Sequence, residues 1–188
     1  MGKIFLVFII ILGLESARQA VASLKKGRRI EELEQFALND SMTGFYNRNA
    51  YDYFIYNEKN IKNYMVVTFD LNNLKMCNDN YGHSSGDAYI IHSAHIIETT
   101  FDRFGKCYRI GGDEFCCLIP DAAEFQIERF IQKMQQDIAI LNNKNIIPTE
   151  VGIACGYALA TPDDADIEKV RERADEMMYH NKKVLKGL

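Results

Sequence analysis

Two adjacent acidic residues follow a glycine pair between two apolar runs near the middle of the chain. The apolar runs span residues 107–110 and 115–119, and the segment between them is Gly111-Gly112-Asp113-Glu114. Two apolar runs joined by a short glycine-containing segment predict a β-hairpin, with the glycines supplying the positive φ angles of a tight turn. The pattern therefore predicts two antiparallel strands with two carboxylates at their tip. Taken alone, such a glycine pair is more often a plain turn than a functional loop.

Strands and helices are mixed along the rest of the chain. Strands are predicted at 64–70 and 151–160, and helices from Ser84 to about Ile97, at 121–141 and at 164–185. Ser84, Ser85 and Asp87 are predicted to cap the first of these helices. The order β-α-β-β-α-β-α predicts an α+β domain, in which helices flank a mostly antiparallel sheet of the split βαβ type.

The composition limits the classes of protein to which the chain can belong. Its 188 residues are 47% hydrophobic and carry a formal net charge of −4, which suits one globular domain with an appendage. Without a basic block, a nucleic acid polymer is not expected as a partner, because its affinity comes mostly from Lys and Arg. The five cysteines lie in apolar segments without metal-ligand spacing, which predicts reduced core thiols and a cytosolic catalytic domain.

The first 39 residues divide into two predicted segments. Residues 1–14 contain an apolar run that is shorter than the ~20 residues a membrane-spanning helix needs. We favour part of a membrane anchor at the inner face of the cell membrane; a signal peptide and a helix packed on a partner chain are the alternatives. Residues 15–39 have helical spacing of apolar positions and predict a connecting helix, either a coiled-coil seam or a helix lying on the domain. The globular domain is expected to span 40–188.

Three carboxylates are candidates for a magnesium site. Asp70 ends the strand at 64–70, and Asp113 and Glu114 lie on the hairpin, so the three converge if the strands are neighbours. Magnesium prefers oxygen ligands, usually one or two carboxylates with water and substrate phosphates, and two such ions can assist a phosphoryl transfer. Adjacent strand residues point to opposite faces, so Asp113 and Glu114 are expected to have different roles. A solvated strand edge is the plain alternative.

Four ordered motifs strengthen the functional interpretation. They are DSMTGFYNR at 40–48, FDLNNLKMCNDNYGHSSGD at 69–87, RIGGDEF at 109–115 and ADEMMY at 174–179. Together they closely resemble the GGDEF family of diguanylate cyclases, from about Asp40 to Lys186. The resemblance implies a homodimer that condenses two GTP molecules into cyclic di-GMP with release of pyrophosphate, and two Mg²⁺ ions per active site, with Mn²⁺ as an alternative.

The resemblance also implies roles for individual residues. The metal ligands fall on Asp70, the backbone carbonyl of Leu71, and Asp113. Glu114 is a candidate for assisting deprotonation of the ribose 3′-hydroxyl, with Asp113 as its rival. Asn78 and Asp87 match the positions that read guanine, and their amide and carboxylate groups suit its donors and acceptor. The expected phosphate contacts are Asn73, Leu74, Lys75, Lys182 and Lys186, and His83 is either a substrate contact or a structural residue.

Several positions depart from the family's pattern. Asn72 stands where a second aspartate is common, and Lys186 replaces a frequent arginine. Asp102 and Gly105 stand where many members have the ends of an Arg-x-x-Asp product site, so we expect no product inhibition through it. These departures leave open an alternative function: a catalytically weak GTP-binding module that acts as a signalling sensor or interaction domain. The upstream signal and the turnover rate have no signature in the sequence.

Overall fold

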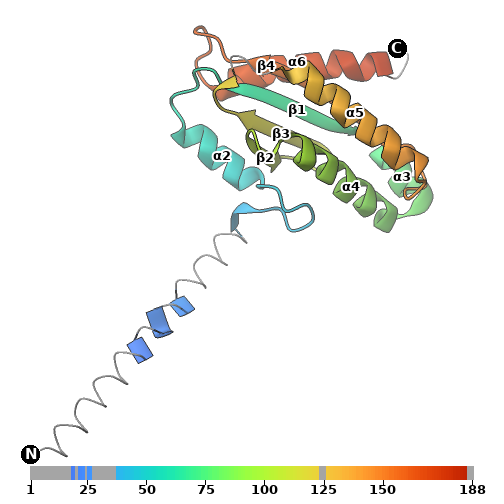
Figure 1. Cartoon of the computed structure of the whole chain (residues 1–188), viewed down its shortest axis with the longest axis horizontal. Coiled ribbons are helices and arrows are strands. Elements are labelled where there is room, and N and C mark those ends of the chain that lie inside the picture. Colours follow the sequence, from blue (N-terminus) through green and yellow to red (C-terminus); the bar gives the residue numbers. More distant parts are fainter. Residues whose placement is uncertain (1–17, 20, 24, 27–36, 123–125, 186–188) are drawn as a thin grey trace, which may run out of the picture. The chain divides into compact units, whose positions relative to one another are not determined.

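The computed structural model describes residues 18–19, 21–23, 25–26, 37–122 and 126–185 (Figure 1). The chain divides into two units, Met1–Ala37 and Leu38–Leu188. The few described residues of the first unit are helical and exposed, whereas the predicted apolar segment and most of the connecting helix lie outside the described residues. Among the described residues, no helix has both the length and the apolar character needed to cross a membrane.

The second unit contains one antiparallel sheet of four strands. They are β1 (Met65–Asn72), β2 (Lys106–Arg109), β3 (Glu114–Ile119) and β4 (Gly152–Leu159), in the spatial order β2-β3-β1-β4. Every neighbouring pair is antiparallel, and β1 lies between β3 and β4. This arrangement confirms the predicted α+β fold and brings the end of β1 next to the hairpin.

The helices differ from the prediction in number and at their starts. They are α2 (Arg48–Asn57), α3 (Leu74–Tyr81), α4 (His83–Phe101), α5 (Ile127–Asn143) and α6 (Ile167–Leu185). The predictions did not include α2 or α3. The predicted cap of α4 is wrong, because the helix starts at His83 after Gly82, which makes no side-chain cap hydrogen bond. Gly82 has a φ of +81°, so a glycine turn rather than capping chemistry separates α3 from α4.

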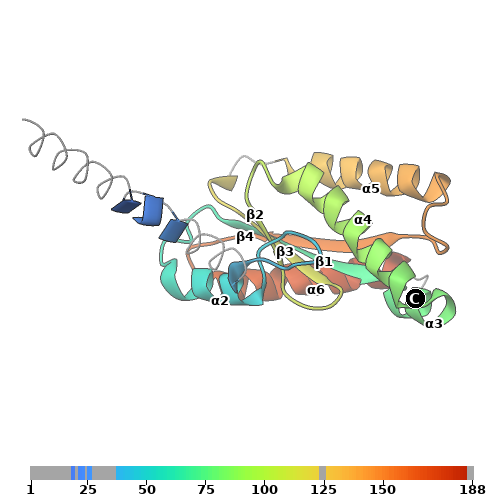
Figure 2. The same ribbon diagram turned by 90° about the horizontal axis from the view of Figure 1, so that it is seen from below.

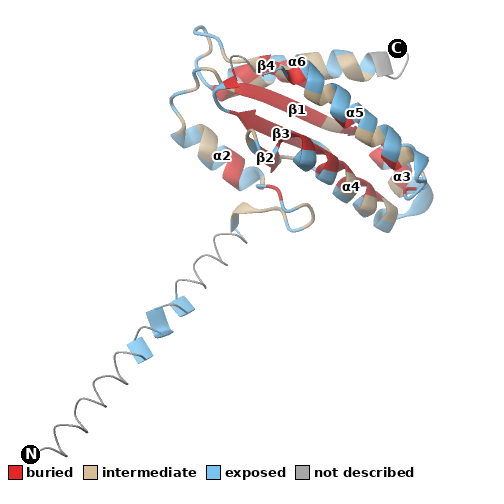
Figure 3. Cartoon of the chain, in the orientation of Figure 1, coloured by how far each residue is buried: buried red, intermediate tan, exposed pale blue. Residues whose placement is uncertain are grey.

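Helices cover both faces of the sheet. Figure 2 shows α4 and α5 on one face and α2 and α6 on the other. Side chains of β1 alternate between the two: Val67 and Phe69 belong to the cluster packed by α4 and α5, and Val66 belongs to the cluster packed by α2 and α6. The strands are therefore mostly buried (Figure 3). Polar side chains reach solvent chiefly where the strands end, which is where the candidate site lies.

The hairpin forms as predicted, but its glycines have a different role. Neither Gly111 nor Gly112 has a positive φ, so that part of the prediction is wrong. The loop runs over residues 110–113, and the carbonyl oxygen of Glu114 accepts hydrogen bonds from the backbone N–H groups of Ile110 (3.0 Å) and Gly111 (3.3 Å). Such a longer loop does not need the positive φ angles of a two-residue turn. A Cβ at Gly111 would meet the Glu114 carboxylate at 2.8 Å, so this glycine leaves room for a side chain.

Candidate functional site

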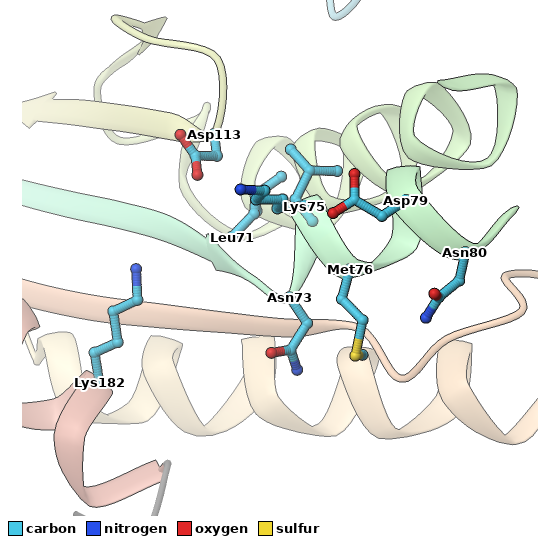
Figure 4. A pocket seen from close by; sticks show the side chains of 9 residues that line it. Leu71, Asn73, Lys75, Met76, Asp79, Asn80, Asp113 and Lys182 are labelled. Carbon is cyan, nitrogen blue, oxygen red and sulfur yellow. The ribbon is translucent and has the colours of Figure 1, made fainter. Parts of the chain in front are cut away.

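A cavity of about 480 Å³ lies where β1, the hairpin, α3 and α6 meet. Its lining residues come from all four segments and are Leu71, Asn73, Leu74, Lys75, Met76, Asp79, Asn80, Asp113 and Lys182. Figure 4 shows Asp113 at one side of this cavity and Lys182 extending toward it from α6. The fold therefore brings together six residues that the sequence analysis selected for metal or substrate binding.

Lys182 pairs with one of the two predicted metal-binding carboxylates and lines the cavity with the other. Its Nζ donates a hydrogen bond to Oδ1 of Asp70 at 2.5 Å, and Lys182 also lines the cavity beside Asp113. The backbone N–H of Leu71 donates to the carbonyl oxygen of Asp113 at 3.0 Å, which holds the hairpin tip against the end of β1. Asp70 and Lys182 side chains are 14% and 25% exposed, so this ion pair is largely shielded from solvent. The site thus contains a partly buried cation that is paired with Asp70 and lines the same cavity as Asp113.

The position of α6 determines where Lys182 lies. A Cβ at Gly156 on β4 would come within 2.2 Å of backbone atoms of Ala174 and Met178, so α6 packs directly on the strand. One turn later, Nδ2 of Asn181 donates to the carbonyl oxygen of Cys155 at 2.8 Å. Close packing at a glycine and this hydrogen bond hold the helix segment that carries Lys182.

Glu114 does not line the cavity. It is exposed and stands opposite Asp70 in the β1–β3 register. Directly opposed residues of antiparallel strands share a face. Glu114 is therefore grouped with Asp70, whereas Asp113 belongs to the loop and reaches the cavity. The two adjacent acids therefore have different surroundings, and the expectation that they have different roles stays a prediction.

The start of α3 forms another wall of the cavity. Asn73 adopts the left-handed conformation, with a φ of 63°, and precedes the first residue of the helix. Leu74 and Lys75 follow in its first turn and line the cavity with it. The sequence analysis missed three other lining residues: Met76, Asp79 and Asn80. Reading residues 74–81 as a helix would have found them, because residues three and four apart share a helix face.

The predicted guanine-reading residues lie outside this cavity, at the junction of α3 and α4. Asn78 is partly buried on α3. His83 is the first residue of α4, Asp87 follows one turn later, and both are exposed. The Asn78 side chain lies against Gly86, one residue before Asp87. The predicted phosphate contact at Lys186 lies outside the described residues.

Asn72 is buried away from the cavity. It is 7% exposed, packs against Gly152, and lines a separate cavity next to α5. Its backbone carbonyl accepts a hydrogen bond from the Tyr89 hydroxyl at 2.6 Å, and that hydroxyl accepts from the Gly152 N–H at 2.7 Å. Burial raises the pKa of Tyr89 to about 12, so it remains a neutral phenol. A neutral amide suits this buried position better than a carboxylate, which would lose hydration.

Arg109 connects the first motif to the hairpin and was not selected as a site residue. Its guanidinium pairs with Asp40 at 3.1 Å and donates to the carbonyl oxygen of Gly112 at 2.8 Å. Burial favours the neutral form of Asp40, but hydrogen bonds from Thr43 and the Arg109 charge outweigh it and lower the pKa of Asp40. The segment that precedes α2 is thereby tied to the loop that carries Asp113.

The donor set at the cavity fits magnesium, with one constraint. Asp113 and Leu71 line the cavity, and Asp70 lies next to Leu71 on β1 without lining it, so hard oxygens are available from adjacent segments. Magnesium takes its remaining ligands from water and phosphates. The described residues contain no group of three or more acidic, histidine or cysteine side chains placed to hold a metal. The three carboxylates Asp70, Asp113 and Glu114 therefore do not form one metal-binding cluster in the described part of the chain, although β1 and β3 are neighbours.

The fold and the site define an α+β domain with an acidic hairpin beside a lysine-bearing cavity. The sequence profile described as "Diguanylate cyclase, GGDEF domain" matches residues 37–186. The chain therefore belongs to the GGDEF domain family, as the four motifs indicated.

Individual relatives agree with this assignment. Diguanylate cyclase DgcN of Escherichia coli (strain K12) is 31% identical over 157 residues, which cover 80% of this chain and 38% of that protein. Diguanylate cyclase DgcS of Shewanella oneidensis is 26% identical over 168 residues, covering 85% and 54%. The chain thus spans about half or less of the length of these relatives.

The fold also matches a solved structure. The coiled coil and GGDEF domain of DgcB from Caulobacter crescentus, in complex with c-di-GMP, superposes with a TM-score of 0.74 at 23% identity. The match covers 89% of this chain and 94% of that one. At this identity the likeness establishes the fold.

Proposed function

We propose that the chain is a diguanylate cyclase, which condenses two GTP molecules into cyclic di-GMP and pyrophosphate. The observation that carries the proposal is the common cavity of Asp113, Lys182 and the first turn of α3, with Asp70 paired to Lys182. Acids, a shielded cation and backbone N–H groups at a helix start suit a nucleoside triphosphate and divalent metal. The named relatives support the same reaction.

In this proposal the cations and α3 bind the triphosphate. Lys182 and Lys75 offer ammonium groups to phosphate oxygens as point charges. The left-handed Asn73 starts α3 beside the cavity, so the N–H groups of Leu74 and Lys75 are available for phosphates. On substrate binding, Lys182 exchanges part of its contact with Asp70 for phosphate, which frees a carboxylate oxygen.

Asp70, Asp113 and the Leu71 carbonyl are the residues that would hold Mg²⁺, two ions with substrate present. The metal would lower the pKa of the attacking 3′-hydroxyl and neutralise charge on the leaving pyrophosphate. Asp113 lines the cavity, whereas Glu114 is exposed beside Asp70, so we propose that the Asp113 carboxylate would accept the proton of the 3′-hydroxyl. Glu114 is left to assist from the Asp70 side.

Two copies of the chain are required for the product. A cavity of about 480 Å³ suits one GTP, and cyclic di-GMP needs two GTP molecules facing each other. We infer a homodimer in which each subunit supplies one GTP. The segment before Leu38 is proposed to align the two subunits.

We also propose that the domain acts in the cytosol. All five cysteines are buried and unpaired by disulfides, which suits a reducing compartment. Attachment at the inner face of the cell membrane through residues 1–14 is part of this proposal.

The test is incubation of the purified chain with GTP and Mg²⁺ over a range of protein concentrations, followed by chromatography. Cyclic di-GMP that rises faster than linearly with protein concentration is the expected result. Binding of GTP without formation of cyclic di-GMP, even in concentrated protein, would contradict cyclase activity. The remaining function would then be the catalytically weak GTP-binding module.

A further inference from the structure

The Asn78 side chain occupies the space that a side chain at Gly86 would need. An ideal Cβ at Gly86 would lie 1.9 Å from Oδ1, 2.8 Å from Cγ and 3.2 Å from Nδ2 of Asn78. Real Cβ atoms do not approach other atoms this closely, so any larger residue must displace the amide. Gly86 is buried, and it lies one residue before Asp87 on α4.

The backbone does not require glycine at this position. The glycine turn between α3 and α4 is made by Gly82, whose φ is +81°, whereas Gly86 has no positive φ and lies inside a helix. Glycine is a poor residue in a helix interior compared with alanine. The contact with Asn78 is therefore the obstacle to a side chain at Gly86.

The obstacle is also movable. The atom that Cβ would strike is the end of the partly exposed Asn78 side chain and not a backbone atom. This differs from Gly156, where a Cβ would strike the backbone of α6. An alanine at position 86 should consequently rotate the Asn78 amide away and leave both helices in place.

We propose that Gly86 is a positioning residue for base recognition. Because Gly86 lacks a side chain, the Asn78 amide can lie against α4 at the residue before Asp87. One edge of a guanine could then form hydrogen bonds with both the Asn78 amide and the Asp87 carboxylate. The inference rests on the proposed function, because it takes GTP as the substrate. An amide held in one orientation presents its donor and acceptor in a fixed order, which discriminates between bases that offer different hydrogen-bonding groups.

The first experiment is a double-mutant cycle of Gly86→Ala and Asn78→Ala. Each single variant should raise the KM for GTP by about 3- to 10-fold with little change in kcat, since one uncharged hydrogen bond to the base is lost or misplaced. The double variant should match Asn78→Ala alone, because no amide remains to be displaced. The same variants should also discriminate less between GTP and ITP, which lacks the exocyclic amine, as measured by the ratio of their kcat/KM values. Ser84→Ala, an exposed position in the same helical turn, is the matched control.

A second measurement needs no nucleotide. In the Asn78→Ala background, Gly86→Ala should raise Tm by about 2–4 °C through better helix propensity. In the wild-type background the displaced amide should cancel most of that rise. An equal rise in both backgrounds would show that the contact is absent.

The outcomes separate this inference from the proposed function. If the wild-type chain binds GTP but Gly86→Ala raises the KM equally with and without the Asn78 side chain, the positioning role of Gly86 is overturned. The proposed cyclase activity would still stand. A wild-type chain that binds no GTP would overturn both, and the Tm cycle would then report only on the packing.

Discussion

The two faces of the sheet are built from different chemistry. The face covered by α4 and α5 is closed by aliphatic and aromatic side chains, such as Phe101, which packs against Phe69 with ring centroids 5.3 Å apart. The face covered by α2 and α6 has a smaller apolar cluster of its own, which includes Val66 and Val170, and adds a row of polar contacts along α6. Arg171 pairs with Glu168 at 2.9 Å and with Asp175 at 2.7 Å, and Lys182 continues the row to Asp70.

Both faces therefore contribute apolar burial, and the α6 side adds directional contacts that reach the candidate site. Apolar burial on the α4 and α5 side raises the free energy of unfolding, and it does so without requiring particular atoms to face each other. The polar row on the α6 side fixes orientation, because hydrogen bonds and ion pairs require particular atoms to face each other. We therefore expect substitutions on the two sides to have different signatures, and four variants test this from the largest effect to the smallest.

Asp113→Asn tests the chemistry at the hairpin tip. Loss of the negative charge should lower kcat by roughly 10⁴-fold, about 5.5 kcal/mol of transition-state stabilisation, because the loop would lose its metal-binding charge. Unfolding by urea should be nearly unchanged. The measurement is the rate of cyclic di-GMP formation. Asp163→Asn, at an exposed acid in the β4–α6 loop, is the matched control. Turnover within tenfold of wild type would remove Asp113 from the mechanism.

Phe101→Ala tests the apolar side. The side chain is fully buried, so its removal should cost about 3–5 kcal/mol of unfolding free energy through lost burial and a cavity. Circular dichroism during urea unfolding measures the loss. Tyr56→Ala, at a side chain that is 78% exposed, should change stability by no more than about 0.5 kcal/mol. A small effect at Phe101 would break the proposed division between the faces.

Lys182→Gln tests the end of the polar row. We expect kcat/KM to fall by about 10- to 100-fold, or about 1.4–2.7 kcal/mol, because a phosphate-binding cation is lost. Stability should fall by about 1–3 kcal/mol, because the mostly buried Asp70 carboxylate loses its charged partner. Lys183→Gln, at the next residue, where the ammonium lies over the Tyr179 ring, is the control. Equal losses of activity in the two variants would argue against a specific role for Lys182.

Tyr51→Phe tests the other end of that row. The Tyr51 hydroxyl donates to Glu168 at 2.8 Å, and Glu168 keeps its pairing with Arg171 when the hydroxyl is gone. The expected cost is therefore only about 1 kcal/mol of unfolding free energy, with unchanged activity. Thermal unfolding and a standard turnover assay check both. A large loss of activity would mean that α2 controls the site through α6.

The sheet was predictable from the sequence because each strand is a compact apolar run. The hairpin was found from the runs on both sides of Gly111 and Gly112, although the φ angles were predicted incorrectly. That error arose because the glycine pair was interpreted as a two-residue tight turn, whereas the loop has four residues and closes through hydrogen bonds to the Glu114 carbonyl oxygen. The α3 helix escaped detection because its asparagines are poor helix formers and its first turn follows a left-handed residue.

The candidate site was only partly predictable. Motif resemblance placed Asp70, Asp113 and Lys182, which the fold brings together. It did not find Asp79, whose place in the cavity depends on the face of α3, or the bond between Arg109 and Asp40 across the fold. It also associated Asn72 with the metals, whereas the side chain is buried on the far side of the strand end. Side-chain direction at the end of a twisted strand follows from packing that the local sequence does not contain.

The segment between Leu38 and Asn47 protects an edge of the sheet. Tyr46 lies beside β2, where its N–H donates to the carbonyl oxygen of Cys107 at 3.1 Å and its carbonyl accepts from the N–H of Arg109 at 2.8 Å. An uncovered strand edge invites pairing with another chain. A shortened chain that begins at Asn47 would keep every strand and every residue of the cavity, yet it would expose that edge and aggregate.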